Sequence, residues 1–407
     1  MGILAGLRVV EVSAFVAAPS AGLALAQMGA EVIRIDDIRG GLDYRRWPVT
    51  EDNTSLFWQG LNKSKRSVAI DIRRPEGREL ARSIICASGE DAGILLTNFP
   101  PKGWLDYDSL REARQDLIQL TVMGNRDGDS AVDYTVNPAL GVPMFTGPED
   151  HVGPVNSVLP AWDCITGQMA VSGLLAAERH RSRTGEGQHI KLALEDVAMA
   201  TMGTLGFIAE AELGFDRERS GNYLYGAFGR DFVSADGVQF MLVGLTPKQW
   251  RGLCSATELE TKMEQLAHAR GLDFSREGDR YEARKEIAAL IQPWAASRNI
   301  GEIDAAFSAQ NVCWGRYQST QEMVLNDPAC SAENPLFVRR EQAGIGEMLM
   351  PGSPLEFTGL DREDVMGAPG LGEHTDQVLS ELLQLSSGEI GRLHDQKLVS
   401  SGRRSTS

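Results

Sequence analysis

Asp163 opens a stretch in which acidic, small and basic residues follow one another at helical spacing. Residues 162–188 read WDCITGQMAVSGLLAAERHRSRTGEGQ. A helix that begins near Asp163 would bring small and aliphatic side chains to one face, at Gly167, Ala170, Leu174 and Ala177. The basic run 179–183 would complement the helix dipole, and TGEGQ would end the helix. Position alone favours a helix N-cap for Asp163, but a carboxylate is also a side chain that attacks acyl groups.

The five cysteines are a second candidate source of chemistry. They are widely spaced and form no CxxC pair: Cys86, Cys164, Cys254, Cys313 and Cys330. This pattern predicts free thiols in a reducing cytoplasm and no zinc or other metal site. Cys164 stands beside Asp163, but no histidine is near it in the sequence, so a buried packing thiol is expected rather than a nucleophile.

Composition limits the classes of partner. The chain has 407 residues, of which 42% are hydrophobic, so it can form a large core, in two domains or in one elaborate domain. A net charge of -16 argues against a nucleic-acid partner. The first residues, MGILAGLRVVEVS, lack a basic region followed by a long apolar run, which predicts no signal peptide, no membrane span and a cytoplasmic location.

Alternating apolar strands and helices predict an α/β fold with a mainly parallel, Rossmann-like sheet. Strands are expected at LRVVEVS, EVIRI, SVAIDI, AGILLTNF, LIQLTVMG and HIKLALED, with helices between them. The first loop, AFVAAP, lacks the glycine fingerprint of a dinucleotide site, so this topology does not imply NAD.

The domain ranges follow from changes in this pattern. We expect a large domain at 1–215, a smaller α+β domain at 216–330 and a segment at 331–400 that returns to the large domain. The polar tail at 401–407 is expected to fray.

Motifs along most of the chain resemble those of the family III coenzyme A (CoA) transferases. In chain order they are KSKRSVAIDIRRPEG, NFPPKG, DYTVNPALG, the stretch around Asp163 and LGEHTDQVL. The resemblance runs from about residue 7 to about residue 383. It implies an enzyme acting on a small-molecule acyl-CoA, with Asp163 as the covalent nucleophile. It also implies a homodimer whose two subunits interlock, and no cofactor beyond the CoA part of the substrate.

The same resemblance assigns residues to the CoA site. The backbone at Val16 and Ala17 would contact CoA, and the strand ends would contribute Ile72, Arg73, Asn98 and Phe99. The cations Arg39 and Lys102 are candidates for phosphate contacts, since open parallel sheets bind ligands at these strand ends. The substrate pocket would include Trp47, Tyr134, Tyr225 and Gly226.

Several reactions are compatible with a family nucleophile. Racemases of the family use a histidine before the aspartate, whereas this chain has none before His151. Transfer between separate acids, transfer within one molecule and non-catalytic CoA binding remain. Family transferases often carry a mobile glycine run that acts as a flap, but this chain has GNYLYGAFGRDF, with Tyr223, Tyr225 and Phe228. These bulky side chains favour a closed pocket and transfer within one dicarboxylate.

Overall fold

A computed structural model describes residues 2–402, which form two compact units. The large unit comprises residues 2–140, 158–209 and 328–402, and the small unit comprises 141–157 and 210–327. Of the predicted frayed tail, residues 403–407 lie outside the described part of the chain.

The large unit contains a seven-stranded sheet in the order β12-β3-β2-β1-β4-β5-β6. Its strands are β1 (Arg8–Val12), β2 (Glu31–Asp37), β3 (Arg66–Ile70), β4 (Ile94–Thr97), β5 (Ile118–Met123), β6 (Gln188–Ala193) and β12 (Val399–Ser400). All neighbouring strands are parallel except β12, which pairs antiparallel with β3. The predicted mainly parallel α/β sheet is confirmed, in the strand order of a Rossmann fold.

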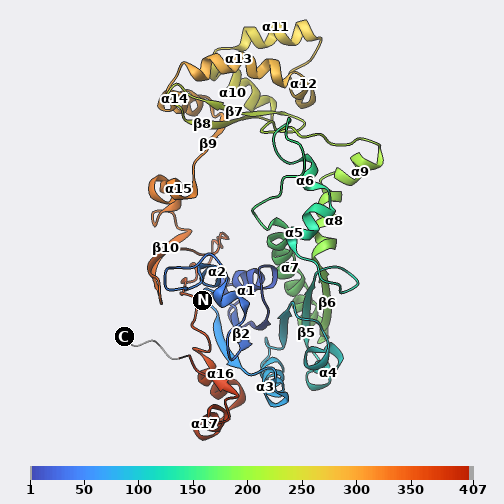
Figure 1. Cartoon of the computed structure of the whole chain (residues 1–407), viewed down its shortest axis with the longest axis vertical. Coiled ribbons are helices and arrows are strands. Elements are labelled where there is room, and N and C mark those ends of the chain that lie inside the picture. Colours follow the sequence, from blue (N-terminus) through green and yellow to red (C-terminus); the bar gives the residue numbers. More distant parts are fainter. Residues whose placement is uncertain (1, 403–407) are drawn as a thin grey trace. The chain divides into compact units, whose positions relative to one another are not determined.

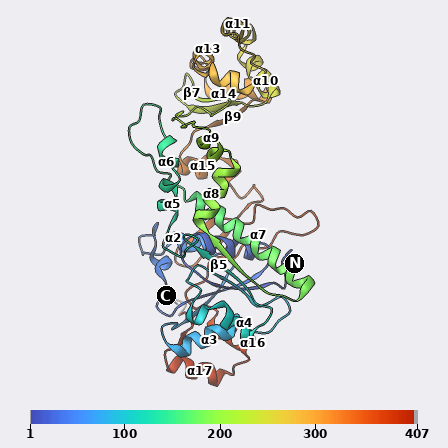
Figure 2. The same cartoon turned by 90° about the vertical axis from the view of Figure 1, so that its right-hand side faces the viewer.

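Helices cover both faces of this sheet, as Figures 1 and 2 show. Val9 of β1 belongs to one core with α1 (Ala17–Gln27) and α7 (Ala161–Thr184). Its neighbour Val10 belongs to the other core, with α3 (Pro75–Ile85) and α16 (Thr375–Leu383). Successive strand residues point to opposite faces, so strands buried on both faces need continuous apolar runs.

Shorter elements complete the large unit. They are η1 (Leu42–Arg45), α2 (Leu56–Leu61), η2 (Gly103–Leu105), α4 (Tyr107–Ala113), α5 (Asp133–Ala139), α8 (Leu194–Thr204), η3 (Pro328–Cys330), β10 (Phe337–Gln342), β11 (Gly346–Pro351) and α17 (Ser387–Asp395). The apolar stretch after β6 forms two helices. Helix α8 ends at Thr204, and α9 (Phe207–Glu212) begins after Gly206, whose φ of 84° breaks the helix.

The small unit has a three-stranded antiparallel sheet in the order β7-β8-β9. Its elements are α6 (Val142–Phe145), β7 (Phe228–Val233), β8 (Gln239–Gly244), α10 (Pro247–Thr257), α11 (Glu260–Arg270), α12 (Glu277–Glu282), α13 (Arg284–Ala296), α14 (Ile300–Gln310), β9 (Cys313–Arg316) and α15 (Thr320–Asn326). Phe240 and Phe307 pack edge to face within its core, beside Trp314.

The segment 141–157 groups with the small unit, whereas the predicted ranges include it in the large domain. Arg219 accounts for this grouping, because its guanidinium donates hydrogen bonds to the carbonyls of Thr146 (2.8 Å) and His151 (2.6 Å). It also donates to Pro143 O at 3.1 Å. A side chain 60 or more positions away therefore fixes the segment, and no local pattern predicts such a contact.

None of the described helices combines the length and the apolar character that a membrane span requires.

Arg34 of β2 is the centre of a buried ion cluster in the large unit. Its guanidinium lies 2.9 Å from Glu11 Oε1, 3.1 Å from Asp36 Oδ2 and 3.4 Å from Asp43 Oδ2. Lys65 Nζ lies 2.9 Å from Glu11 Oε2. All five side chains are at most 4% exposed, so each charge depends on its partners rather than on water.

We expect Arg34→Met to lower the free energy of unfolding by about 3–5 kcal/mol, because it leaves buried carboxylates without their counter-ion. Urea denaturation of the purified protein measures this change. Arg126→Met is the control, since Arg126 pairs with Asp196 at the surface and is 80% exposed. A loss no larger than that of the control would contradict the assigned role of Arg34.

Candidate active site

Asp163 lies in the first turn of α7, on a helix that packs closely against α1. The predicted packing face is confirmed, since Gly167, Ala170, Leu174 and Ala177 are all buried. A Cβ on Gly167 would lie 2.1 Å from Ser20 Oγ and 2.9 Å from Ala17 O. Gly167 therefore allows the Asp163 end of α7 to approach the first turn of α1.

The carboxylate of Asp163 does not cap its own helix. The N-cap position is Pro160, and within residues 2–402 no hydrogen bond to the Asp163 carboxylate is formed. The capping acceptor is Asp133 of α5, whose Oδ2 accepts hydrogen bonds from the backbone N–H groups of Trp162 (2.8 Å) and Asp163 (3.1 Å). Asn137 Oδ1 accepts from Trp162 Nε1 at 3.0 Å. Helix α5 thus fixes the first turn of α7 and leaves the Asp163 carboxylate available for chemistry.

Two charged neighbours act on Asp163 in opposite directions. Its pKa is raised from 3.8 to about 6, first by burial and second by the negative charge of Asp133, while Arg46 opposes the shift. At neutral pH the carboxylate is still mainly ionised, as a nucleophile requires, and its basicity exceeds that of an exposed aspartate.

We expect Asp133→Asn to move the acid limb of the activity profile to lower pH. Asn still accepts a backbone hydrogen bond, but loss of the negative charge lowers the pKa of Asp163, so the nucleophile stays ionised at lower pH. The measurement is kcat/KM for the acyl-CoA substrate against pH. Trp162→Phe is the matched control, because it removes the bond to Asn137 and keeps the charge. An acid limb that stays in place or moves upward in Asp133→Asn would refute this coupling.

The expectation of a buried packing thiol at Cys164 is wrong. Cys164 is exposed, because the buried face of α7 follows Trp162, Thr166 and Gly167 and residue 164 lies on another side of the helix. Its pKa is raised by partial desolvation of the sulfur and by the charges of Asp163 and Asp133, which disfavours the thiolate. Asp163 is therefore the better nucleophile of the two.

The predicted CoA residues near β1 and β4 lie together in the large unit. Val16 is the N-cap of α1 and Ala17 its first, buried residue. Asn98, after β4, holds the loop between β1 and α1 with both polar groups of its side chain. Its Nδ2 donates to Ala14 O (2.7 Å) and its Oδ1 accepts from Ala14 N (2.9 Å). Its position supports the shape of this loop, and direct contact of these residues with CoA stays a prediction.

The predicted cations are differently placed. Arg39 and Arg73 both approach Asp37, with Nε–O distances of 2.8 and 3.4 Å, at the carboxyl ends of β2 and β3. Lys102 is exposed and, within residues 2–402, its side chain has no ion-pair or hydrogen-bond partner. The apolar side chains of Ile72 and Phe99 pack against the sheet core. Phosphate binding at Arg39 or Arg73 would have to compete with Asp37.

Comparisons with known proteins agree with this arrangement. Residues 4–375 match the model of "CoA-transferase family III". The chain belongs to this family. It is 57% identical over 400 residues to the 2-methylfumaryl-CoA isomerase of Chloroflexus aurantiacus, covering 98% of each chain. It is 30% identical to the succinate–glutarate CoA-transferase of Agrobacterium fabrum, over 93% of this chain and 95% of that one.

The fold has solved relatives as well. A CaiB/BaiF family protein from Brucella suis superposes with a TM-score of 0.74 at 24% identity, covering 94% of this chain and 99% of that chain. The protein is thus an enzyme of CoA-transferase family III with the fold of that family.

The family residues predicted for the substrate pocket fall in both units. In the large unit Trp47 is 79% and Tyr134 52% exposed, and Tyr134 follows the capping residue Asp133. Tyr225 and Gly226 belong to the small unit, where the Tyr225 hydroxyl donates to Glu210 Oε1 at 2.5 Å. A pocket role for these four residues stays a prediction.

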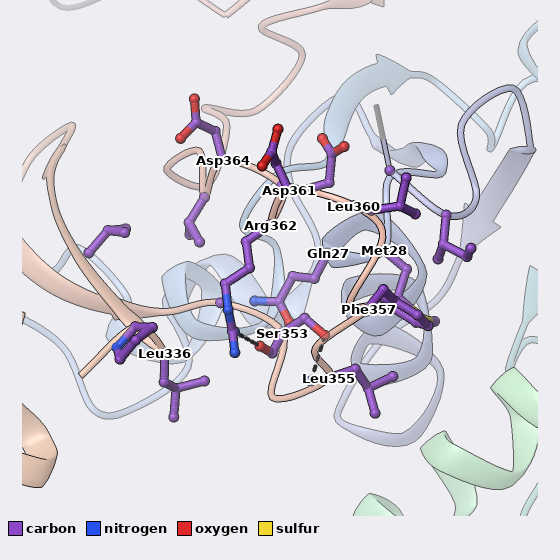
Figure 3. Close-up of a pocket in the computed structure, with 17 residues that line it drawn as sticks. Gln27, Met28, Leu336, Ser353, Leu355, Phe357, Leu360, Asp361, Arg362 and Asp364 are labelled. Carbon is purple, nitrogen blue, oxygen red and sulfur yellow. Dashed lines mark hydrogen bonds between the residues drawn. The ribbon is translucent and has the colours of Figure 1, made fainter.

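A pocket elsewhere in the large unit is unsuited to CoA. Figure 3 shows it between the end of α1 and the segment 335–365, where Arg362 donates to Ser353 O at 2.7 Å. Asp361 and Asp364 are among its lining residues and would repel CoA phosphates, and no predicted site residue lines it.

Two residues near Asp163 were missed by the sequence analysis as site residues. Asp133 stands in the quoted DYTVNPALG motif, but its capping role depends on a contact 29 and 30 residues away. Arg46 stands in GLDYRRWP, beside the predicted Trp47. Within residues 2–402, no group of three or more His, Cys, Asp or Glu side chains is arranged to hold a metal ion.

Proposed function

We propose that this enzyme moves CoA from one carboxyl group of mesaconate to the other, converting 2-methylfumaryl-CoA to 3-methylfumaryl-CoA. The observation that carries the proposal is the 57% identity to the Chloroflexus aurantiacus isomerase over 98% of both chains. The partly buried Asp163, with its carboxylate unused by the helix cap, supports an aspartate nucleophile.

The proposed chemistry passes through two kinds of covalent intermediate. Asp163 attacks the thioester carbonyl, which gives a mixed anhydride and releases CoA thiolate. The thiolate attacks the aspartyl carbonyl, which gives an aspartyl-CoA thioester and frees that carboxylate of mesaconate. The other mesaconate carboxylate then attacks the aspartyl thioester, forming a second anhydride and releasing the thiolate again. Attack of the thiolate on the mesaconyl carbonyl restores Asp163 and completes the transfer.

Each tetrahedral step develops an oxyanion, so backbone N–H groups are needed near the reacting carbonyl. The glycine-containing turns near Asp163 or at Gly226 are the proposed donors. Water must be excluded throughout, because the anhydrides and the aspartyl thioester are hydrolysable.

The test is incubation of the purified enzyme with 2-methylfumaryl-CoA, with and without free acids. The proposal expects 3-methylfumaryl-CoA to form at the same rate in both reactions. The alternative is transfer between separate acids, as the name of the 30%-identical succinate–glutarate CoA-transferase describes for that relative. In that case product would form only when a free carboxylic acid is added.

We also propose that the enzyme works as an interlocked homodimer. Size-exclusion chromatography with light scattering is expected to give twice the 44.3 kDa of one chain. Dilution should not dissociate it, because interlocked chains separate only after partial unfolding. An active species with the mass of a single chain would count against this assembly.

A further inference from the structure

Arg46 is a cation held between two aromatic rings in the large unit. Its guanidinium carbon lies 5.1 Å from the ring centre of Phe15 and 4.8 Å from that of Phe57. Both distances are within the range of cation–π contacts, which orient a guanidinium without using its N–H groups.

The backbone around Arg46 is fixed as firmly as its side chain. Ser55 Oγ donates to Arg46 O at 2.6 Å, and Arg46 N donates to Asp43 O at 3.3 Å. The Asp43 carboxylate also accepts from Phe15 N (3.0 Å), which holds Phe15 at the unusual φ of 69°. Asp43 therefore places both Arg46, through its backbone carbonyl, and Phe15, through its carboxylate, and Arg34 in turn holds that carboxylate.

The N–H groups of Arg46 remain available for a ligand. Within residues 2–402, no acceptor receives a hydrogen bond from this guanidinium and no carboxylate lies within ion-pair distance of it. Arg39, in contrast, pairs with Asp37 at 2.8 Å. A planar guanidinium with free donors matches a carboxylate, which it binds through two parallel hydrogen bonds.

Arg46 is linked to the helix of the nucleophile through Phe15. This ring directly precedes Val16, the N-cap of α1, and the first turn of α1 packs against Gly167, one turn from Asp163 in α7. The positive charge of Arg46 also lowers the pKa of Asp163, against the effect of Asp133, although Arg46 and Asp163 form no ion pair. We therefore expect a ligand group bound by Arg46 to lie near the carbonyl that Asp163 attacks. The phosphates of CoA are separated from that carbonyl by the whole pantetheine arm, whereas the second carboxylate of a short dicarboxylic acid lies close to it.

We infer that Arg46 binds the free carboxylate of a dicarboxylic acyl-CoA while Asp163 attacks the thioester at the other end. The inference rests on the proposed function, in which the acyl-CoA substrate and the acyl-CoA product each carry one free carboxylate. After CoA has moved, the carboxylate that CoA has left binds to Arg46 in place of the carboxylate that was bound there before. Arg46 would thus recognise both substrate and product and favour them over monocarboxylic acyl-CoA esters.

The test compares binding of three probes to the Asp163→Ala enzyme, in which no turnover interferes. The probes are 2-methylfumaryl-CoA, the monocarboxylic crotonyl-CoA and CoA itself. Adding Arg46→Gln is expected to weaken binding of 2-methylfumaryl-CoA about 10- to 100-fold, the range of a lost hydrogen bond between charged groups. Binding of crotonyl-CoA and CoA should change less than about threefold.

Matched variants separate the charge from the structure. Arg45→Gln removes the neighbouring, exposed arginine and should leave the affinities for all three probes unchanged. Arg46→Lys keeps the charge but loses the planar fork, so its affinity for 2-methylfumaryl-CoA should fall between those of Arg46 and Arg46→Gln. Thermal unfolding of each variant verifies that the fold is retained.

Two results would overturn the inference. Equal weakening of all three probes in Arg46→Gln would assign Arg46 to CoA or to the shape of the loop, and an unchanged affinity for 2-methylfumaryl-CoA would remove it from the site. The proposed function fails separately, if the wild-type enzyme does not isomerise 2-methylfumaryl-CoA. Even then the comparison of dicarboxylic and monocarboxylic probes still decides the role of Arg46.

Discussion

Asp163→Ala is expected to abolish CoA transfer while the fold and CoA binding persist. The side chain supplies the covalent nucleophile in the proposed mechanism, and its loss should lower kcat/KM by roughly 10⁴-fold or more. Stability should change little, because the Asp163 carboxylate caps no helix and its backbone N–H is held by Asp133 whatever the side chain. Steady-state kinetics and thermal unfolding measure the two effects.

Trapping experiments identify the modified side chain directly. Hydroxylamine or borohydride added during turnover should modify Asp163, which a mass spectrum detects as a mass change of the peptide that contains this residue. Cys164→Ser is the control, because Cys164 is the neighbouring exposed thiol and the trapped product should be unaffected by its loss. Asp163→Ala enzyme that kept more than a few per cent of activity, or label found on Cys164, would exclude the aspartate mechanism.

The fold was largely predictable because its strands are buried on both faces. Runs such as VAI in β3 and ILL in β4 are apolar because helices cover both sides of the sheet, so they stand out in the sequence. The buried face of α7 was equally predictable from the spacing of its small and apolar residues, since Gly167, Ala170 and Leu174 lie on one side of the helix.

The details that the sequence does not reveal are tertiary contacts. Asp133 acts on α7 across about 30 residues, and Arg46 becomes a candidate ligand only because Phe15 and Phe57 come together around it. In the same way, the carbonyl contacts of Arg219 place 141–157 in the small unit. Such contacts leave no periodic signal, because they join residues that are neither neighbours nor on one helix face.

Isotopically labelled free mesaconate, added during turnover, is expected to remain outside the CoA ester. Exchange between separate acids requires one acid to leave and another to enter, which a mobile glycine flap would assist. The corresponding stretch here is anchored within the small unit. Tyr225 donates to Glu210 and lies under the guanidinium of Arg217, 3.9 Å from its ring centre, and Arg230 donates to the Tyr223 hydroxyl at 2.7 Å.

Anchored aromatic side chains restrict backbone freedom, whereas glycines increase it. A dicarboxylate retained beside Asp163 needs only to turn end for end, and its effective concentration far exceeds that of free acids in solution. Succinate and acetate should therefore be poor acceptors in the wild-type enzyme. The measurement is the rate of label entry into the CoA ester, compared with the rate of isomerisation.

Tyr225→Gly tests the physical cause of this retention. It removes the hydroxyl bond to Glu210 and the ring beneath Arg217, and it restores a glycine of the kind that family flaps carry. Label entry should rise at least about tenfold relative to isomerisation, because a looser stretch lets one acid escape before CoA returns. Glu210→Gln is the milder control, since the amide still accepts the tyrosine hydroxyl and label entry should stay low. Label that enters wild-type product as fast as isomerisation proceeds would instead favour transfer between separate acids, and the anchored stretch would then have no part in retaining the substrate.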